Sequence, residues 1–397
     1  YNKTTKKYEE VVRNVSWNDY YNMLFIENPV GVGFSNIVDI NDVTQNETRV
    51  AEHMLNALLN FYTNPNFTFL SSLRNTPLYF FGESYGGHYI PPMCDRILRY
   101  NAETTGFKIP LKGAGVGNGW VDPPYQFREF GLYGYALGLI NEDERARVEA
   151  SQMDALFNIQ QGRSHLSQGD FEAASPFMKK ALDDFSSVVN NISKAGGGVN
   201  DYDYRIYKSY DSLIIDAAMY FSQADSQKRY CTRGSRFGDK NWEPSSSEVY
   251  SNMSLYDFMD TVAPNISNLL NNSFPMIFYN GQDDIVCNSA GTQTWLSYLE
   301  WTGKKEFYTA PVQNWKLNNG TRAGIAKNYG PLTFAVVNRA GHLAPMDQVA
   351  ATAELVKRFI GGSEDWSQPF YDSPKQEKVS IEKLFDEVDY LTKINIQ

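Results

Sequence analysis

Short apolar runs alternate along much of the chain with longer amphipathic stretches. Such runs predict buried strands, and a stretch such as Glu47–Tyr62, with apolar residues at helical spacing, predicts a helix. The alternation is typical of an α/β fold with a doubly wound, mostly parallel sheet. The predicted strands are Tyr21–Glu27, Leu78–Phe81, Leu111–Gly115, Met276–Asn280 and Leu332–Val337.

This alternation stops between residues 141 and 259. Two polar helical stretches, Glu142–Leu156 and Asp170–Val189, are followed there by a glycine run and by the tyrosine- and aspartate-rich Asp201–Asp211. We therefore expect a core of residues 1–140 and 260–362, with residues 141–259 inserted as a helical lid over a cleft. A passive surface insertion is the alternative.

The last segment, residues 363–397, starts with a proline-containing loop and ends with an amphipathic pattern. We predict a C-terminal helix that packs on the core, with a partner-docking helix as the alternative. Its apolar residues at helical spacing are Ile381, Leu384, Phe385, Val388 and Leu391.

A candidate nucleophile follows the second predicted strand. The run Leu78–Phe81 leads into Gly82-Glu83-Ser84-Tyr85-Gly86, and a helical pattern follows directly. A serine between glycines at a strand-to-helix turn is the nucleophile elbow of serine hydrolases, which exposes the hydroxyl above the sheet. Ser84 is therefore the predicted nucleophile, and a surface serine in a glycine turn is the alternative.

A general base must follow Ser84 if the order is Ser, Asp/Glu, His, as it is in elbow-type hydrolases. Of the four histidines, His165 lies in a polar stretch without a preceding strand, whereas His342 closes the apolar run Leu332–Val337 and its loop. Loops at the carboxyl ends of parallel strands carry catalytic side chains. His342 is the predicted base, with a structural role at the strand end as the alternative.

The acid that orients the histidine is expected after Met276–Asn280, where Asp283 and Asp284 stand side by side. Successive side chains point to opposite sides, so one can face the imidazole while the other has a structural role. The pattern alone does not choose between them. The glycine-rich Gly113–Gly117, followed by Asn118, lacks the spacing of a nucleotide-binding loop and is interpreted as a loop beside the active site.

Four motifs in this order closely resemble those of the serine carboxypeptidases, and the resemblance covers about residues 20–360. They are Phe25–Ser35, Phe81–Pro91, Asn280–Cys287 and Ala340–Gln348. The resemblance implies an α/β-hydrolase fold and exopeptidase activity without a cofactor. The sequence around Gly281-Gln282 and Ala340–His342 is most similar to that of the vitellogenic-like, lysosomal branch.

The resemblance also implies roles for single residues. It selects Asp284 as the acidic member of the triad, since that member lies three residues before the cysteine of the motif. It places Cys287 as an unpaired thiol in the substrate pocket and puts Leu343 among the substrate-binding residues. Glu83, desolvated beside the nucleophile, would share a proton with a second acid and bind a peptide C-terminal carboxylate best in acid, with an exposed charge as the alternative.

The backbone N–H of Tyr85, next after the nucleophile, is the expected first oxyanion donor. Family members carry an upstream glycine-rich segment with the second donor and most of the carboxylate clamp, and nothing like it stands between Tyr1 and Phe25. A hydrolase sheet without the opening strands would expose an unpaired edge and much apolar surface. We expect the chain to be a fragment of the functional molecule, with a separate chain as one source of the missing N-terminal piece.

Composition narrows the function further. Of the 397 residues, 42% are hydrophobic, which suits a globular enzyme, and the net charge of −10 without a basic cluster argues against nucleic-acid partners. No apolar run is long enough to span a bilayer, and no cysteine or histidine spacing indicates a metal site. The three cysteines leave the pairing of Cys94 and Cys231 open.

Glycosylation sequons suggest the secretory pathway, and hence a lysosomal, vacuolar or secreted protein. They begin at Asn2, Asn14, Asn46, Asn66, Asn191, Asn252, Asn265, Asn271 and Asn319.

These observations predict a serine-type carboxypeptidase that releases C-terminal amino acids from peptides at acidic pH. The oligomeric state stays open, with a homodimer as one option. An acyltransferase on the same scaffold is one alternative, because an alcohol can intercept an acyl-enzyme as readily as water. A non-catalytic scaffold or partner-stabilising protein is the other, supported by the absent oxyanion segment and weakened by the presence of Ser84, Asp284 and His342 in order.

Overall fold

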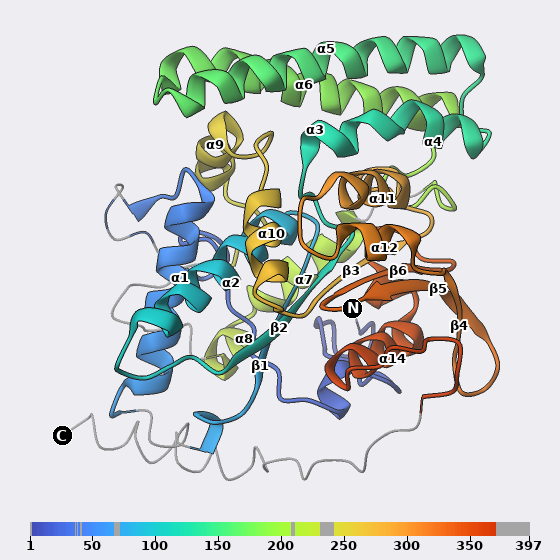
Figure 1. Ribbon diagram of the computed structural model, residues 1–397. Coiled ribbons are helices and arrows are strands. Elements are labelled where there is room, and N and C mark those ends of the chain that lie inside the picture. The colour runs from blue at the N-terminus through green and yellow to red at the C-terminus, as the bar shows by residue number, and fades with distance from the viewer. Residues whose placement is uncertain are drawn as a thin grey trace.

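Figure 1 shows the computed structural model of the protein, which describes residues 2–35, 37, 39, 42–66, 72–207, 211–230 and 242–370. A six-stranded sheet in the order β1-β2-β3-β6-β5-β4 forms the centre of the molecule. The strands are β1 (Leu78–Glu83), β2 (Leu111–Gly117), β3 (Met276–Gly281), β4 (Gln313–Lys316), β5 (Arg322–Tyr329) and β6 (Leu332–Val337).

Strands β1, β2, β3 and β6 run parallel, and their carboxyl ends therefore meet at one edge of the sheet. Strands β5 and β4 continue the sheet in antiparallel fashion after β6. Four of the five predicted strands are confirmed, and they form the parallel part. The α/β-hydrolase class predicted from the sequence agrees with this mixed, mainly parallel sheet.

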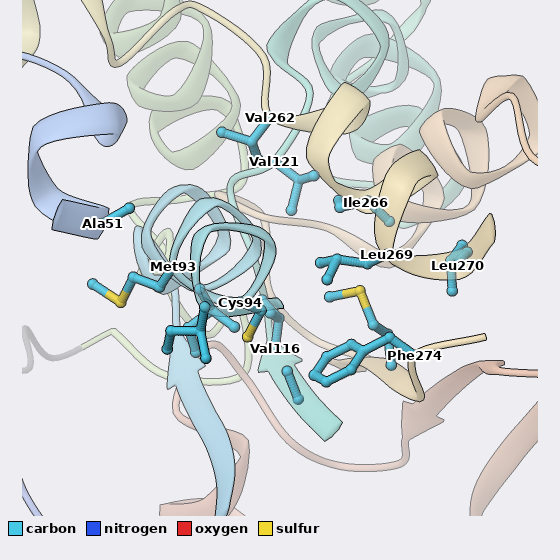
Figure 2. Close-up of a cluster of buried hydrophobic side chains, with 14 of the residues drawn as sticks. Ala51, Met93, Cys94, Val116, Val121, Val262, Ile266, Leu269, Leu270 and Phe274 are labelled. Atoms are coloured by element: carbon cyan, nitrogen blue, oxygen red, sulfur yellow. The ribbon is translucent and has the colours of Figure 1, made fainter. Parts of the chain in front are cut away.

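Helices cover both faces of the sheet. The side chains of β3 alternate between two apolar clusters, with Met276 and Phe278 in one and Ile277 and Tyr279 in the other. The first cluster joins the sheet to α1 (Glu47–Thr63), α2 (Gly86–Glu103) and α10 (Ala263–Asn271), and part of it is seen in Figure 2. The second cluster includes α14 (Val349–Ile360). Shorter elements complete the core: η1 (Trp17–Asp19), α3 (Pro123–Gln126), η4 (Phe127–Glu129), α4 (Phe130–Ala136), α11 (Ser289–Tyr298), α12 (Lys304–Thr309) and α13 (Ala344–Asp347).

Only helices and connecting segments occur in the described part of residues 141–259. They are α5 (Glu142–Ser167), α6 (Phe171–Ala195), α7 (Asp211–Phe221), α8 (Ala224–Arg229) and α9 (Ser247–Tyr256). Helices α5 and α6 form a long antiparallel hairpin across one end of the molecule (Figure 1). The two helices approach closely where a Cβ on Gly162 would lie 2.8 Å from the Met178 sulfur.

One predicted strand is wrong, and two strands were not predicted. Tyr21–Glu27 is no strand, because it has no ladder of backbone hydrogen bonds to a described neighbour, and the Phe25 side chain in it is 85% exposed. The antiparallel hairpin β4–β5 was not predicted, because its polar residues hide the apolar alternation that identifies a strand.

The predicted C-terminal helix and Cys231 lie outside the described residues. Within the described part of the chain, no helix is both long enough and apolar enough to cross a bilayer.

Candidate active site

Ser84 occupies a sharp turn between β1 and α2. Its φ of +59° lies in the left-handed region, which is unusual for a serine and typical of the nucleophile elbow. Close packing fixes the turn: a Cβ on Gly82 would lie 2.8 Å from the Ile90 side chain, and one on Gly87 only 2.5 Å from the Trp120 carbonyl oxygen. Gly86, by contrast, has no atom within 4 Å of such a Cβ.

The backbone of Ser84 is also tied to the end of β2. Its N–H donates to the Gly117 carbonyl at 3.0 Å, and its carbonyl accepts from the Trp120 N–H at 2.9 Å. Tyr85, the next residue, directly precedes α2, so its N–H lies at the positive end of the helix dipole. A negative oxygen that develops beside Ser84 would be stabilised there.

Asp284 and His342 form a buried hydrogen-bonded pair. The distance between Asp284 Oδ2 and His342 Nδ1 is 2.7 Å, and both side chains are almost fully buried. Asp284 also accepts from Asn118 Nδ2 at 2.8 Å and from the N–H groups of Val286 at 2.9 Å and Cys287 at 3.2 Å. Four donors therefore hold this carboxylate in one orientation.

The same hydrogen bond sets the tautomer of His342. Because Asp284 accepts at Nδ1, that nitrogen carries the proton, and Nε2 has the lone pair that a base requires. Nε2 is buried and makes no hydrogen bond with any described residue. Burial by itself lowers the pKa of His342, but the charge and hydrogen bond of Asp284, with the charges of Glu83 and Asp201, leave this pKa above its usual value.

Asp283 contacts other residues than Asp284 does. Its Oδ1 accepts from the Tyr204 hydroxyl at 2.8 Å, and its Oδ2 lies 3.1 Å from Nε of Arg205. Of the two candidate acids, the structure thus brings Asp284 to His342 and Asp283 to the inserted region.

Glu83 ends β1 beside the nucleophile. Its pKa is raised to about 7: burial raises it most, the charge of the neighbouring His342 lowers it, and the charges of Asp284 and Asp347 raise it. Glu83 therefore carries a proton through much of the acidic range. The Ser84 N–H donates to the Gly117 carbonyl and the next residue, Asn118, donates to Asp284, so the elbow and the Asp284–His342 pair lie at the same edge of the sheet.

The remaining predicted site residues lie close by. Cys287 is buried, and burial together with the charges of Asp284 and Glu83 raises the pKa of its thiol, so it stays neutral. Its sulfur and ligand atoms of Asp284 and His342 lie within 4.8 Å of one another, a group that could hold a metal ion. The Asp284–His342 hydrogen bond already satisfies two of these three groups. Leu343 is half-buried and follows His342 directly.

Two parts of the site were missed in the sequence. Asn118, in the loop expected beside the active site, donates to Asp284 and accepts from the Gly281 N–H at 2.9 Å, and so joins the ends of β2 and β3. The segment 200–206 lies against both catalytic loops. In it the Tyr202 carbonyl accepts from the His342 N–H at 2.7 Å, and the two rings lie 4.6 Å apart. Only its tyrosine and aspartate content set this segment apart in the sequence.

The fold and the strand-to-helix serine turn define an α/β hydrolase. Comparison with known proteins identifies the group within that class: the model of the serine carboxypeptidase family matches residues 2–362. The chain belongs to the serine carboxypeptidase family.

Its curated relatives have about 30% identical residues. The pheromone-processing carboxypeptidase KEX1 of Phytophthora infestans is 30% identical over 87% of this chain and 57% of its own length. Serine carboxypeptidase-like 49 of Arabidopsis thaliana is 31% identical over 88% of this chain and 65% of its own length. The chain thus spans less than two thirds of these relatives.

A solved structure supports the fold. The prohormone-processing carboxypeptidase KEX1(ΔP) of Saccharomyces cerevisiae superimposes with a TM-score of 0.69 over 85% of this chain and 73% of its own, at 21% sequence identity.

Proposed function

We propose that the protein is a serine-type carboxypeptidase that releases C-terminal amino acids from peptides through an acyl-enzyme and works best in acid. The observation that carries this proposal is the arrangement at one sheet edge of the Ser84 elbow, the Asp284–His342 pair and a protonated Glu83. The membership of the serine carboxypeptidase family supports it independently.

In the proposed reaction, Ser84 Oγ attacks the carbonyl carbon of the last peptide bond while its proton passes to His342 Nε2. The Asp284 carboxylate, 2.7 Å from Nδ1, stabilises the imidazolium that forms. The Tyr85 N–H stabilises the oxyanion, and His342 then returns the proton to the leaving amine. Water, activated by the same base, hydrolyses the acyl-enzyme. The second oxyanion donor stays a prediction.

Glu83 accounts for the preference for a free C-terminus. A protonated carboxyl group can donate a hydrogen bond to the substrate carboxylate, whereas an ionised one would repel it. With the pKa of Glu83 raised to about 7, the binding form prevails in acid and is lost as the pH rises through 7. Peptide binding should therefore weaken above neutral pH, whereas the raised pKa of His342 limits catalysis from the acid side, where the imidazole is protonated.

The test compares a peptide that has a free C-terminal carboxylate with its C-terminal amide, at about pH 5 and with an alcohol present. Mass spectrometry should show release of single C-terminal residues from the free peptide and little from the amide. Ester formation with the alcohol in place of hydrolysis would favour the acyltransferase, and an inert protein would favour the scaffold.

Other features of the proposal follow from the same arguments. Residues 141–259 are a lid whose segment 200–206 contacts the catalytic loops, and Cys287 and Leu343 line the substrate pocket. Passage through the secretory pathway to a lysosome, vacuole or the cell exterior fits the sequons, of which Asn14, Asn46, Asn66, Asn191, Asn271 and Asn319 are exposed. The vitellogenic-like branch, the homodimer and a separate N-terminal chain stay predictions.

A further inference from the structure

A second buried acid pair lies outside the Asp284–His342 site. Glu47 begins α1 and Asp257 follows α9, and the two residues are 6% and 8% exposed. The Glu47 backbone N–H donates to Asp257 Oδ1 at 3.2 Å, which joins the core to the inserted region. The proposed mechanism assigns no role to either carboxyl group.

The pair can be buried only if it holds a proton. Neither carboxylate oxygen of Glu47 receives a hydrogen bond from a described residue, yet the side chain lies within hydrogen-bonding reach of Asp257. Asp257, in contrast, accepts the Glu47 N–H at Oδ1 and the Tyr85 hydroxyl at Oδ2, so each of its oxygens already has a donor. Burial and the charge of Asp257 raise the pKa of Glu47 well above its usual value, and Glu47 therefore carries the proton.

Tyr85 connects this pair to the nucleophile. Its hydroxyl donates to Asp257 Oδ2 at 2.7 Å, and its ring is stacked between those of His88 at 4.9 Å and Phe258 at 5.1 Å. The Tyr89 ring adds an edge-on contact at 5.0 Å, so four contacts hold the side chain of Tyr85, the residue after Ser84. Asp257 is thus bonded directly to the residue whose N–H is the expected oxyanion donor.

A cavity of about 190 Å³ is lined by both acids, and four other titratable or charged side chains face it. They are His88, Arg96 and Arg99 from α2 and Asp260 from the segment after α9. Arg96 is ion-paired with Glu52 and Arg99 with Asp95, so neither arginine neutralises Glu47.

We propose that Glu47 and Asp257 share one proton and act together as positioning residues for Tyr85, so that loss of this proton disturbs the oxyanion site. A second negative charge at Glu47 would repel Asp257 and release the Tyr85 hydroxyl. This inference rests on the proposed function, because it gives the Tyr85 N–H a role in acyl transfer.

The variant Glu47→Gln separates the proton from the shape of the side chain, since the amide still donates to Asp257 but does not titrate. The first measurement is the unfolding equilibrium constant from about pH 5 to 7. Unfolding of the wild type releases the Glu47 proton, and unfolding of Glu47→Gln does not. For each pH unit, the unfolding constant of the wild type should therefore increase by a factor about ten times larger than that of the variant. The control Glu103→Gln, at an exposed position of α2, should keep the wild-type slope.

The second measurement is kcat against pH for a neutral p-nitrophenyl ester of an N-acylated amino acid, which has no carboxylate for Glu83 to bind. Wild-type kcat should fall on the alkaline side, whereas Glu47→Gln should retain its kcat there. Tyr85→Phe and Asp257→Asn should lower kcat by about tenfold to 100-fold with little change in KM. Tyr85→Phe keeps the stacked ring and covers the case in which Asp257→Asn fails to fold.

Equal unfolding slopes for the wild type and Glu47→Gln would overturn the shared proton. Different slopes with identical kcat profiles would overturn the positioning role. A wild type that hydrolyses neither ester nor peptide would overturn the proposed function and with it the positioning role, and the unfolding slope would report on the proton alone.

Discussion

The base and the nucleophile of the proposed triad are held in different ways. Asp284 and His342 follow β3 and β6, inner strands in which nearly every residue is buried. Ser84 follows β1, the last strand on its side of the sheet among the described residues, and every residue of this strand is only half-buried. The acid–base pair is thus fixed by side-chain hydrogen bonds inside the core, whereas the nucleophile is fixed by backbone strain and two backbone bonds to the end of β2.

The Asp284–His342 pair and the Ser84 turn, the two halves of the site, should therefore respond differently to substitution. Changes around Asp284 should reduce both stability and activity, because the same hydrogen bonds serve both. Changes at Ser84 should remove activity alone, since its hydroxyl is not part of the structure that holds the turn.

The largest effect is expected for Ser84→Ala. Loss of the nucleophile should lower kcat for peptide hydrolysis by about 10⁶-fold. The unfolding free energy, measured with denaturant, should stay within about 0.5 kcal/mol of the wild type. A large loss of stability would contradict the contrast between the two halves.

The second-largest loss of activity is expected for Asp284→Asn, and Asp283→Asn is its matched control. The asparagine at 284 can present its amide to His342 and favour the wrong tautomer, so kcat should fall about 10⁴-fold. Asp283→Asn should cost far less, because Asp283 bonds Tyr204 and Arg205 instead. Equal losses in kcat would show that Asp284 is not the one aspartate that orients His342.

Asn118→Ala should destabilise the protein at the buried part of the site around Asp284. It removes two buried hydrogen bonds, to Asp284 and from the Gly281 N–H, and should lower the unfolding free energy by about 2–3 kcal/mol. Asn314→Ala, at an exposed position of β4, is the control. Unfolding free energies that do not differ between the two variants would refute the role given to Asn118.

The smallest effect is expected for Glu83→Gln and depends on pH. In the wild type, KM for a peptide with a free C-terminus should rise up to about tenfold per pH unit above 7, as Glu83 loses its proton. The glutamine keeps a donor and does not titrate, so its KM should stay flat. Parallel KM profiles in the two proteins would exclude Glu83 as the titrating group.

The sequence revealed most of what depends on local pattern. The strands that carry Ser84, Asp284 and His342 follow from buried apolar runs, and the chain order of the three residues follows from the elbow. The choice between Asp283 and Asp284 required the resemblance, because alternation along the chain allows either one to face the imidazole.

What the sequence did not reveal depends on contacts between distant segments. Asn118 meets Asp284 across 166 residues, and Tyr85 meets Asp257 across 172. Tyr21–Glu27 carries a strand pattern, yet pairing with a neighbour decides whether an extended segment becomes a strand. Pattern gives the candidates, and tertiary contacts decide which of them act together.

The most direct test of the account is mass spectrometry of a peptide incubated with the protein at about pH 5, with and without prior treatment by a fluorophosphonate. The account predicts stepwise loss of C-terminal residues, abolished when the reagent is attached to Ser84. An untreated protein that leaves the peptide intact or cuts it internally, or activity that survives with Ser84 labelled, would contradict it.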